Sequence, residues 1–249
     1  ALEPNEKTLR HELIDTAQRA ESLEQFSGMA EELCRDLLNE SERVSLYHYF
    51  AQALESRLEL PEDAHHLLMA GTQDTCSIEL AGLLCQGATP VQYGAVIGTM
   101  MHCANEASDD DRLEFLTLAA RVATNSPTRL QEATSLYQLV LESDPSNIEA
   151  REHCVRVISE NEDWLSVAEI YEKAANADKE DSLALYLRAA DICRENIQDY
   201  EREHRLLKTC WETGGHEPTL ALALLGCKFS LGLHSEALDM LRSESLTKE

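Results

Sequence analysis

The chain has 249 residues, of which 43% are hydrophobic and only 5% aromatic, so it can build a continuous core, and its many Leu, Ala and Glu residues favour helices over sheets. With 46 acidic against 21 basic residues the formal charge is -25, which repels phosphate backbones and argues against a nucleic-acid partner. No apolar run approaches the roughly 18 residues of a membrane span, and no signal peptide leads the chain, so we expect a cytoplasmic protein outside the membrane. Because the chain begins with Ala1, we also expect it to be a segment of a longer protein.

Internal repetition is the strongest signal in the sequence. Residues 24–31 (EQFSGMAE) and 162–169 (EDWLSVAE) share one pattern, and residues 113–123 resemble residues 183–193. The two separations are close to multiples of about 35 residues, which predicts a tandem array of helix pairs. The predicted units are 8–40, 41–74, 75–109, 110–145, 146–180, 181–216 and 217–245.

Small or apolar residues recur at two places in each predicted unit. Near the end of the first helix they are Ala17, Ala51, Cys85, Ala120, Val155, Ala190 and Gly226. In the second helix they are Ala30, Ala64, Gly98, Ala133 and Ala168, whereas the sixth unit has Glu203 and the seventh has Ala237 after a shorter spacing. Small side chains let neighbouring helices approach closely, so we expect these positions to lie at helix contacts.

Large apolar residues and helix breakers fit the same register. Leu13, Tyr47, Leu116, Tyr186 and Leu222 precede the first-helix sites by three or four residues, as on one face of an amphipathic helix. We expect Pro61, Pro90 and Pro127 each to open a second helix. The fourth unit should end at Asp144-Pro145, and Gly214-Gly215 should precede the seventh. The predicted class is all-α, with over about 70% helix and no strand.

Two stretches resemble the tetratricopeptide repeat family. They are Ala133, Tyr137, Val140 and Pro145, and later Leu222, Leu225, Gly226, Phe229 and Ala237. The resemblance implies a single right-handed α-solenoid over residues 1–249 whose concave face, lined by the first helices, binds proteins. Helical repeats of about forty residues fit the spacing less well, and RNA-binding repeats of about 35 residues do not fit the charge.

Polar residues on the first helices define the expected binding face. The residues placed there by the register are His11, Gln18, Ser45, His48, Gln52, Glu79, Gln86, Glu114, Thr117, Arg121, Glu149, Glu152, Arg156 and Asp191. Glu114 with Arg121, and Glu149 with Arg156, repeat the same charges one unit apart. The family's clamp for acidic tails needs a lysine where this chain has His48, Thr117 or Glu152, so we expect a neutral or basic protein or peptide as partner.

Candidate chemical sites have simpler structural explanations. The acidic run that follows Ser108 superficially resembles a terpenoid-synthase metal motif, but it is better read as a helix cap. His11-Glu12 lacks the second histidine of a zinc helix because Asp15 stands there. The eight cysteines form no C-x-x-C pair and lie in apolar helical runs, so we expect reduced thiols. We expect no catalytic residue, metal or cofactor.

The leading hypothesis is a scaffold or adaptor that binds a partner protein. The alternative is a regulatory or sensor module of a larger signalling, transcriptional or protease protein, and a helical enzyme is third. The helix expected at 219–229 is apolar on nearly all sides, and its partner, expected at about 235–243, is short. We therefore expect the C-terminal edge to be covered by further domains of the same protein or by self-association.

Overall fold

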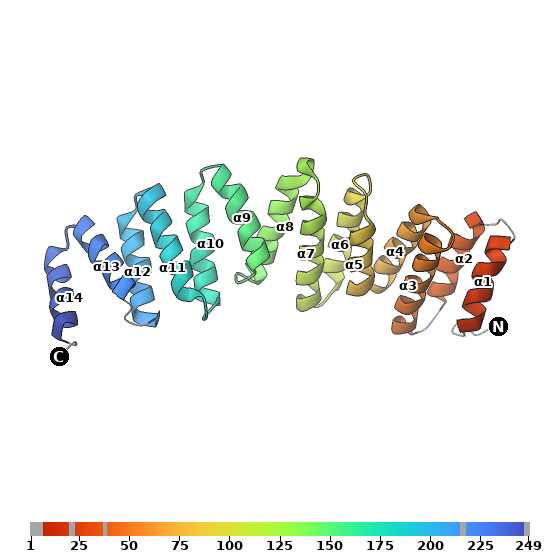
Figure 1. Ribbon diagram of the computed structural model, residues 1–249, viewed down its shortest axis with the longest axis horizontal. Helices are drawn as coiled ribbons and strands as arrows, with labels where there is room; N and C mark the ends of the chain where they lie inside the picture. Colours follow the sequence, from red (N-terminus) through yellow and green to blue (C-terminus); the bar gives the residue numbers. More distant parts are fainter. Residues whose placement is uncertain (1–6, 20–22, 37–38, 215–217, 247–249) are drawn as a thin grey trace. The chain divides into compact units, whose positions relative to one another are not determined.

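The computed structural model describes residues 7–19, 23–36, 39–214 and 218–246. The described residues form fourteen α-helices and two short helical turns, with no strand among them (Figure 1). The described part of the chain is 85% helical, which exceeds the expected share. The predicted all-α class is therefore confirmed.

The chain divides into two compact units, Ala1–Leu136 and Tyr137–Glu249. The first contains α1 (Lys7–Arg19), α2 (Leu23–Arg35), α3 (Glu40–Ser56), α4 (Pro61–Thr75), α5 (Ile78–Gly87), α6 (Tyr93–Glu106), α7 (Asp109–Thr124), a 3-10 turn (Pro127–Arg129) and the start of α8 (Leu130–Ser143). The second contains the rest of α8, then α9 (Ile148–Glu160), α10 (Trp164–Ala177), α11 (Ser182–Ile192), a π-helical turn (Cys193–Ile197), α12 (Tyr200–Gly214), α13 (Pro218–Ser230) and α14 (His234–Leu246). The last helix is longer than the sequence pattern indicated.

Polar caps set the starts of several helices. The side chain before each of five helices accepts a hydrogen bond from a backbone N–H of the first turn; these caps are Asn39, Ser77, Ser108, Asn147 and Asp163. Such a cap stabilises a helix by about 1 kcal/mol. The acidic run after Ser108 fills the first turn of α7, where carboxylates complement the helix dipole. The cap interpretation of this run is confirmed.

The three prolines behave differently. Pro61 is the first residue of α4, as predicted, and Pro127 opens the 3-10 turn that leads into α8. The prediction for Pro90 is wrong, because α6 begins only at Tyr93. The backbone N–H and hydroxyl of Thr89 both donate to Gln92 Oε1, at 2.9 and 2.8 Å, and this turn places Pro90 before the helix.

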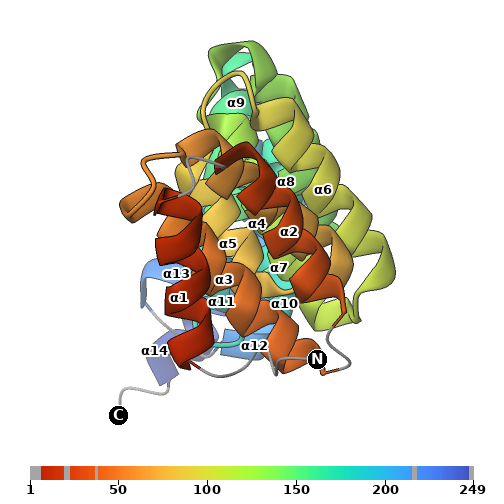
Figure 2. The ribbon, with the colours of Figure 1, turned by 90° about the vertical axis from the view of Figure 1, so that its right-hand side faces the viewer.

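The first unit has two layers of helices. α3, α5 and α7 are neighbours in one layer, and α2, α4 and α6 are neighbours in the other (Figure 2). The Phe26 and Phe50 rings meet edge to face at 5.7 Å and join α2 to α3. α4 packs closely on α3 at Gly71, where an added Cβ would lie 2.6 Å from Cγ of Tyr47. Only glycine fits beside the Tyr47 ring at this spacing.

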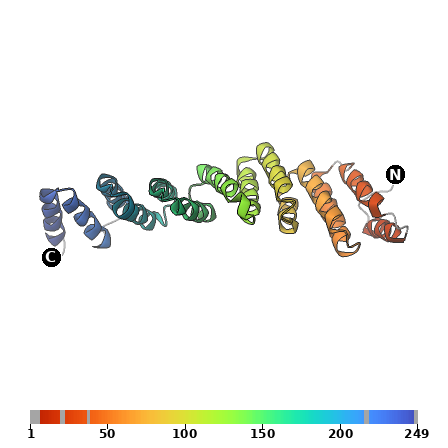
Figure 3. The same cartoon turned by 90° about the horizontal axis from the view of Figure 1, so that it is seen from above.

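In the second unit, each helix from α9 onward packs against the one that follows it (Figure 3). The end of α11 departs from the regular pattern, since it continues into a π-helical turn that stops at Gln198, whose φ is 61°. Arg194 lies in this turn, and its Nη1 is 3.8 Å from Oε1 of Glu203 on α12. No pattern in the sequence indicated this π-helical turn.

Burial corrects the predicted register of the second helices. Two buried residues and then an exposed one recur along four of them, beginning at Ala64, Val96, Ala133 and Val167. Gly98 is exposed, and nothing lies within 4 Å of a Cβ added there. The buried Val96 therefore occupies the helix contact that was predicted for Gly98. In the fifth unit the pattern begins one residue before Ala168. The sequence could not choose between adjacent small and apolar residues.

The first helices depart from the prediction in three units. Ala51, Ala120 and Ala190 are buried as expected. Cys85 in α5 and Val155 in α9 are only half-buried, whereas the residue before each, Leu84 or Cys154, is fully buried. Gly226 in α13 is exposed and has no neighbour near an added Cβ, so it marks no helix contact. The side chain of Ala17 lies outside the described part of the structure.

Candidate functional site

Two of the predicted binding-face residues, His48 and Gln52, line a cleft between α3, α4 and α5. This α3–α5 cleft has a volume of about 340 Å³, and Gln86 lines it from α5. His48 Nδ1 lies 2.9 Å from Oε1 of Glu79, so the two first helices are joined at the edge of the cleft. The sequence register thus brings together four residues of the expected face at this point.

The second helix also contributes to the α3–α5 cleft, which the sequence analysis did not anticipate. Pro61, Ala64, His65 and Leu68 of α4 line it. His65 is buried, and neither of its ring nitrogens has a hydrogen-bond partner among the described residues. Burial lowers the pKa of His65, with a further contribution from His66. A neutral imidazole and apolar α4 side chains therefore form part of the wall of this cleft.

A second cleft lies in the other unit, between α9, α10 and α11. This α9–α11 cleft has a volume of about 290 Å³ and is lined by Asp191 of the predicted set. Ser159 and Arg188 also line it, together with the aromatic side chains of Trp164 and Tyr171 from α10. Asp191 Oδ1 accepts a hydrogen bond of 2.6 Å from Arg194.

The two clefts occupy corresponding positions in the repeat. Leu83, Gln86 and Gly87 of α5 stand at the same distances from Cys85 as Arg188, Asp191 and Ile192 of α11 stand from Ala190. All six residues line their respective clefts. Each unit of the structure therefore has a polar-rimmed cleft where one first helix meets its partner and the next first helix.

Three predicted residues lie on α7 in the first unit. Glu114 and Arg121 are exposed, and the Thr117 hydroxyl donates to the Leu113 carbonyl oxygen at 2.8 Å. Burial raises the pKa of the Cys85 thiol on α5 to about 11, against the opposing charge of Arg121. The charge of Arg121 is therefore felt by a thiol of the neighbouring helix. None of the three α7 residues lines either cleft.

The three predicted residues of α9 have differing environments. Glu149 is half-buried and accepts a hydrogen bond of 2.7 Å from the Tyr137 hydroxyl of α8. Glu152 and Arg156 are exposed, and Arg156 Nη2 lies 3.3 Å from Nδ1 of His153. Burial lowers the pKa of His153, and the charge of Arg156 lowers it further. Glu149 and Arg156 therefore do not repeat the surroundings of Glu114 and Arg121.

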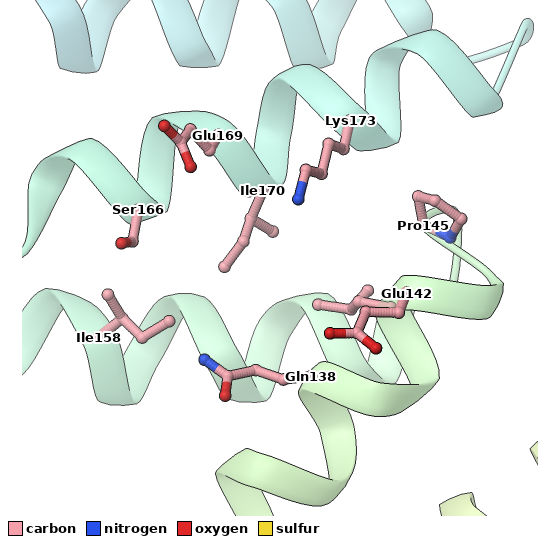
Figure 4. Close-up of a pocket in the computed structure, with 9 residues that line it drawn as sticks. Gln138, Glu142, Pro145, Ile158, Ser166, Glu169, Ile170 and Lys173 are labelled. Atoms are coloured by element: carbon pink, nitrogen blue, oxygen red, sulfur yellow. The ribbon is translucent and has the colours of Figure 1, made fainter.

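A third cleft is absent from the sequence predictions and lies between second helices of the second unit. This α8–α10 cleft, of about 340 Å³, has Leu141, Ile158 and Ile170 as apolar lining, and Figure 4 shows Ile170 and Lys173 pointing from α10 toward the opposite wall. Its polar lining consists of Gln138, Glu142, Ser166, Glu169 and Lys173. None of the predicted binding-face residues lines it.

Metal-ligating and thiol groups can be placed directly in the described part of the chain. Among them, no group of three or more His, Cys, Asp or Glu side chains is placed to hold a metal ion. All eight cysteines are free thiols, six of them buried and Cys76 and Cys85 half-buried. Within the described part of the chain, no helix is long and apolar enough to cross a membrane.

Comparisons with known proteins do not assign a family. No family model matches the chain, and no curated protein matches it. A solved structure titled "Computational Design of Self-Assembling Cyclic Protein Homooligomers" matches 96% of this chain and 96% of its own at 13% identity. Its TM-score is 0.17, too low to carry an argument about fold or assembly.

Proposed function

We propose that the protein is a binding scaffold of the tetratricopeptide kind, which holds a segment of a partner protein along its first helices. The observation that carries the proposal is the pair of corresponding clefts, lined by Gln52 and Gln86 in one unit and by Asp191 in the other. Both combine polar rims with apolar walls, as sites for peptide side chains do. Each unit by itself therefore has a cleft suited to the side chains of a peptide segment.

The charge of the chain favours a neutral or basic partner. The net charge of -25 attracts basic segments over distances limited by ionic screening. A cytoplasmic adaptor and a regulatory module of a longer protein would use the same surface. The proposal therefore concerns the binding activity, which either setting requires.

The test uses charge substitutions that leave the helices intact. Peptides selected from a displayed random library for binding to the wild-type chain are titrated against a Gln52→Lys, Asp191→Lys variant. Added positive charge in the clefts should weaken basic peptides about 5-fold or more, while unfolding free energy stays within about 0.5 kcal/mol.

A matched control carries Gln131→Lys and Glu160→Lys, which make the same change in net charge at exposed positions outside the three clefts. Equal weakening by both variants would mean that only the overall charge matters, and the clefts would lose their proposed role.

A further inference from the structure

The α8–α10 cleft is open where the corresponding helices of the first unit are closed. In the first unit, Gln73 Nε2 of α4 donates to Thr99 Oγ1 of α6 at 3.1 Å, and the Cys103 thiol reaches the Thr72 carbonyl oxygen at 3.4 Å. Thr72, Thr99 and Cys103 are all buried. These bonds leave little room between the two second helices.

The register defined by burial shows why α8 and α10 do not close in this way. Counted from Ala133 and Val167, Glu142 takes the position of Gln73 and Ile170 takes the position of Thr99. A carboxylate opposite an aliphatic side chain cannot form the bond that joins Gln73 to Thr99. The helices therefore leave a cleft with an aliphatic lining and a charged rim.

The rim indicates the chemistry of an occupant. Glu142 on α8 and Glu169 on α10 bring carboxylates to the cleft from both helices, and Lys173 brings one ammonium group. Among the described residues, neither Glu142 nor Lys173 forms an ion pair with any side chain. Glu169 Oε1 lies 3.7 Å from Nη1 of Arg202. A basic side chain suits the two carboxylates, and Lys173 can donate to a backbone carbonyl.

We propose that the α8–α10 cleft binds a segment of a partner protein in which a large aliphatic residue adjoins an arginine or lysine. The aliphatic side chain packs against Leu141, Ile158 and Ile170, and the basic group lies between Glu142 and Glu169. α10 separates this cleft from the α9–α11 cleft, because Ser166, Glu169 and Ile170 line one and Trp164, Val167 and Tyr171 line the other. The site is therefore additional to the surface of the proposed scaffold function.

The test follows isoleucine methyl resonances of the whole chain by NMR, with Ile158 and Ile170 assigned from their valine variants. The probe is the peptide acetyl-Gly-Leu-Arg-Gly-amide, for which one buried side chain and one ion pair suggest a dissociation constant on the order of 1 mM. The Ile158 and Ile170 signals should shift in a saturable way. Ile192, which lines the α9–α11 cleft, should not shift.

Two control peptides isolate the two parts of the recognition. Replacing leucine with serine should weaken binding about 10-fold or more, and replacing arginine with glutamate should weaken it several-fold. Ile170→Asp should abolish the shift at Ile158, and its folding is checked by circular dichroism. Glu142→Gln is a milder variant. It should lower the affinity for the arginine peptide without lowering the affinity for the glutamate peptide.

Three outcomes would overturn the proposal. One is no shift at Ile158 and Ile170, and another is equal binding of the leucine and serine peptides. The third is a shift of these signals with protein concentration in the absence of peptide, accompanied by a larger mass in light scattering, which would make a second copy of the chain the occupant. If only the Ile192 signal shifted, the peptide would bind in the α9–α11 cleft instead. The proposed scaffold function would then stand, and the proposal for the α8–α10 cleft would fail.

Discussion

Two glycines on neighbouring helices show how the same residue type takes opposite roles. Gly71 packs against the Tyr47 ring, and a Cβ added to it would lie 2.6 Å from Cγ of Tyr47. Gly98, in contrast, is exposed and has open space around it. Gly71→Ala should lower the free energy of unfolding by about 1–3 kcal/mol through overpacking. Gly98→Ala should raise it by about 0.5–1 kcal/mol, because alanine is the better helix former.

Urea unfolding of both variants checks this pair of predictions. If the unfolding free energies of both variants changed with the same sign, helix propensity alone would determine the effect of the substitutions. The contact between α3 and α4 would then be looser than in the structure.

Glu203 is a buried carboxyl at a position where other units have alanine or valine. Burial raises its pKa, and the Cys227 thiol and Arg194, which favour the ionised form, only partly offset the rise. A raised pKa in the folded state means that the contribution of Glu203 to stability is complete below its unfolded pKa, near 4.5, and is lost as pH rises through the folded value. Glu203→Gln, which cannot ionise, should therefore gain stability relative to wild type as pH rises above 4.5.

The measurement is the difference in unfolding free energy between Glu203→Gln and wild type from pH 4 to pH 7. Glu201→Gln, an exposed change on the same helix, serves as the matched control. A difference that stays constant across this range would contradict the raised pKa.

At the scale of the elements, α8 and α9 are linked by a hydrogen bond that crosses a predicted unit boundary. The Tyr137 hydroxyl donates to Glu149 Oε1, and the Tyr137 ring lies 4.7 Å from the His153 ring. A hydrogen bond to a charged acceptor contributes about 1.5–3 kcal/mol. Tyr137→Phe should therefore destabilise the protein by about this amount, and Glu149→Gln by less.

A double-mutant cycle on Tyr137 and Glu149 separates their mutual interaction from their other contacts. Additive effects would mean that the hydrogen bond between Tyr137 and Glu149 contributes nothing measurable to stability, which would contradict the prediction.

At the scale of the whole molecule, the net charge of -25 sets a cost on the folded state. Like charges held on a compact surface repel one another, and added salt screens that repulsion. The melting temperature should therefore rise as sodium chloride increases from about 0.01 M to 0.15 M, where the Debye length falls below about 10 Å. Each 1 kcal/mol gained corresponds to about 2–4 °C in a chain of this size.

Scanning calorimetry measures this rise, with sucrose at equal osmolality as the control for effects other than charge. A melting temperature that falls with salt would show that the ion pairs, such as Arg202 with Glu172 at 2.9 Å, outweigh the overall repulsion.

The C-terminal edge also concerns the molecule as a whole. Leu222 of α13 is 70% exposed and Phe229 48% exposed. Leu238 and Leu241 of α14 are exposed as well. These exposures agree with the apolar surface expected from the sequence, and the expectation that further domains or a second copy cover it stays a prediction.

The sequence by itself determined the helical class, a few helix starts such as those of α4 and α7, and the burial of Ala51, Ala120 and Ala190, because a 3.6-residue pattern, caps and small residues are local signals. His48, Gln52, Gln86 and Asp191, which the register placed on the expected binding face, line clefts in the structure. Only the tertiary structure decided which of two adjacent apolar residues, such as Val96 or Gly98, faces the neighbouring helix, since both satisfy the local pattern. Only the structure, likewise, revealed the α8–α10 cleft. Glu142 and Ile170, distant in sequence, line it at the positions where Gln73 and Thr99 bond in the first unit, and no local pattern encodes such a difference.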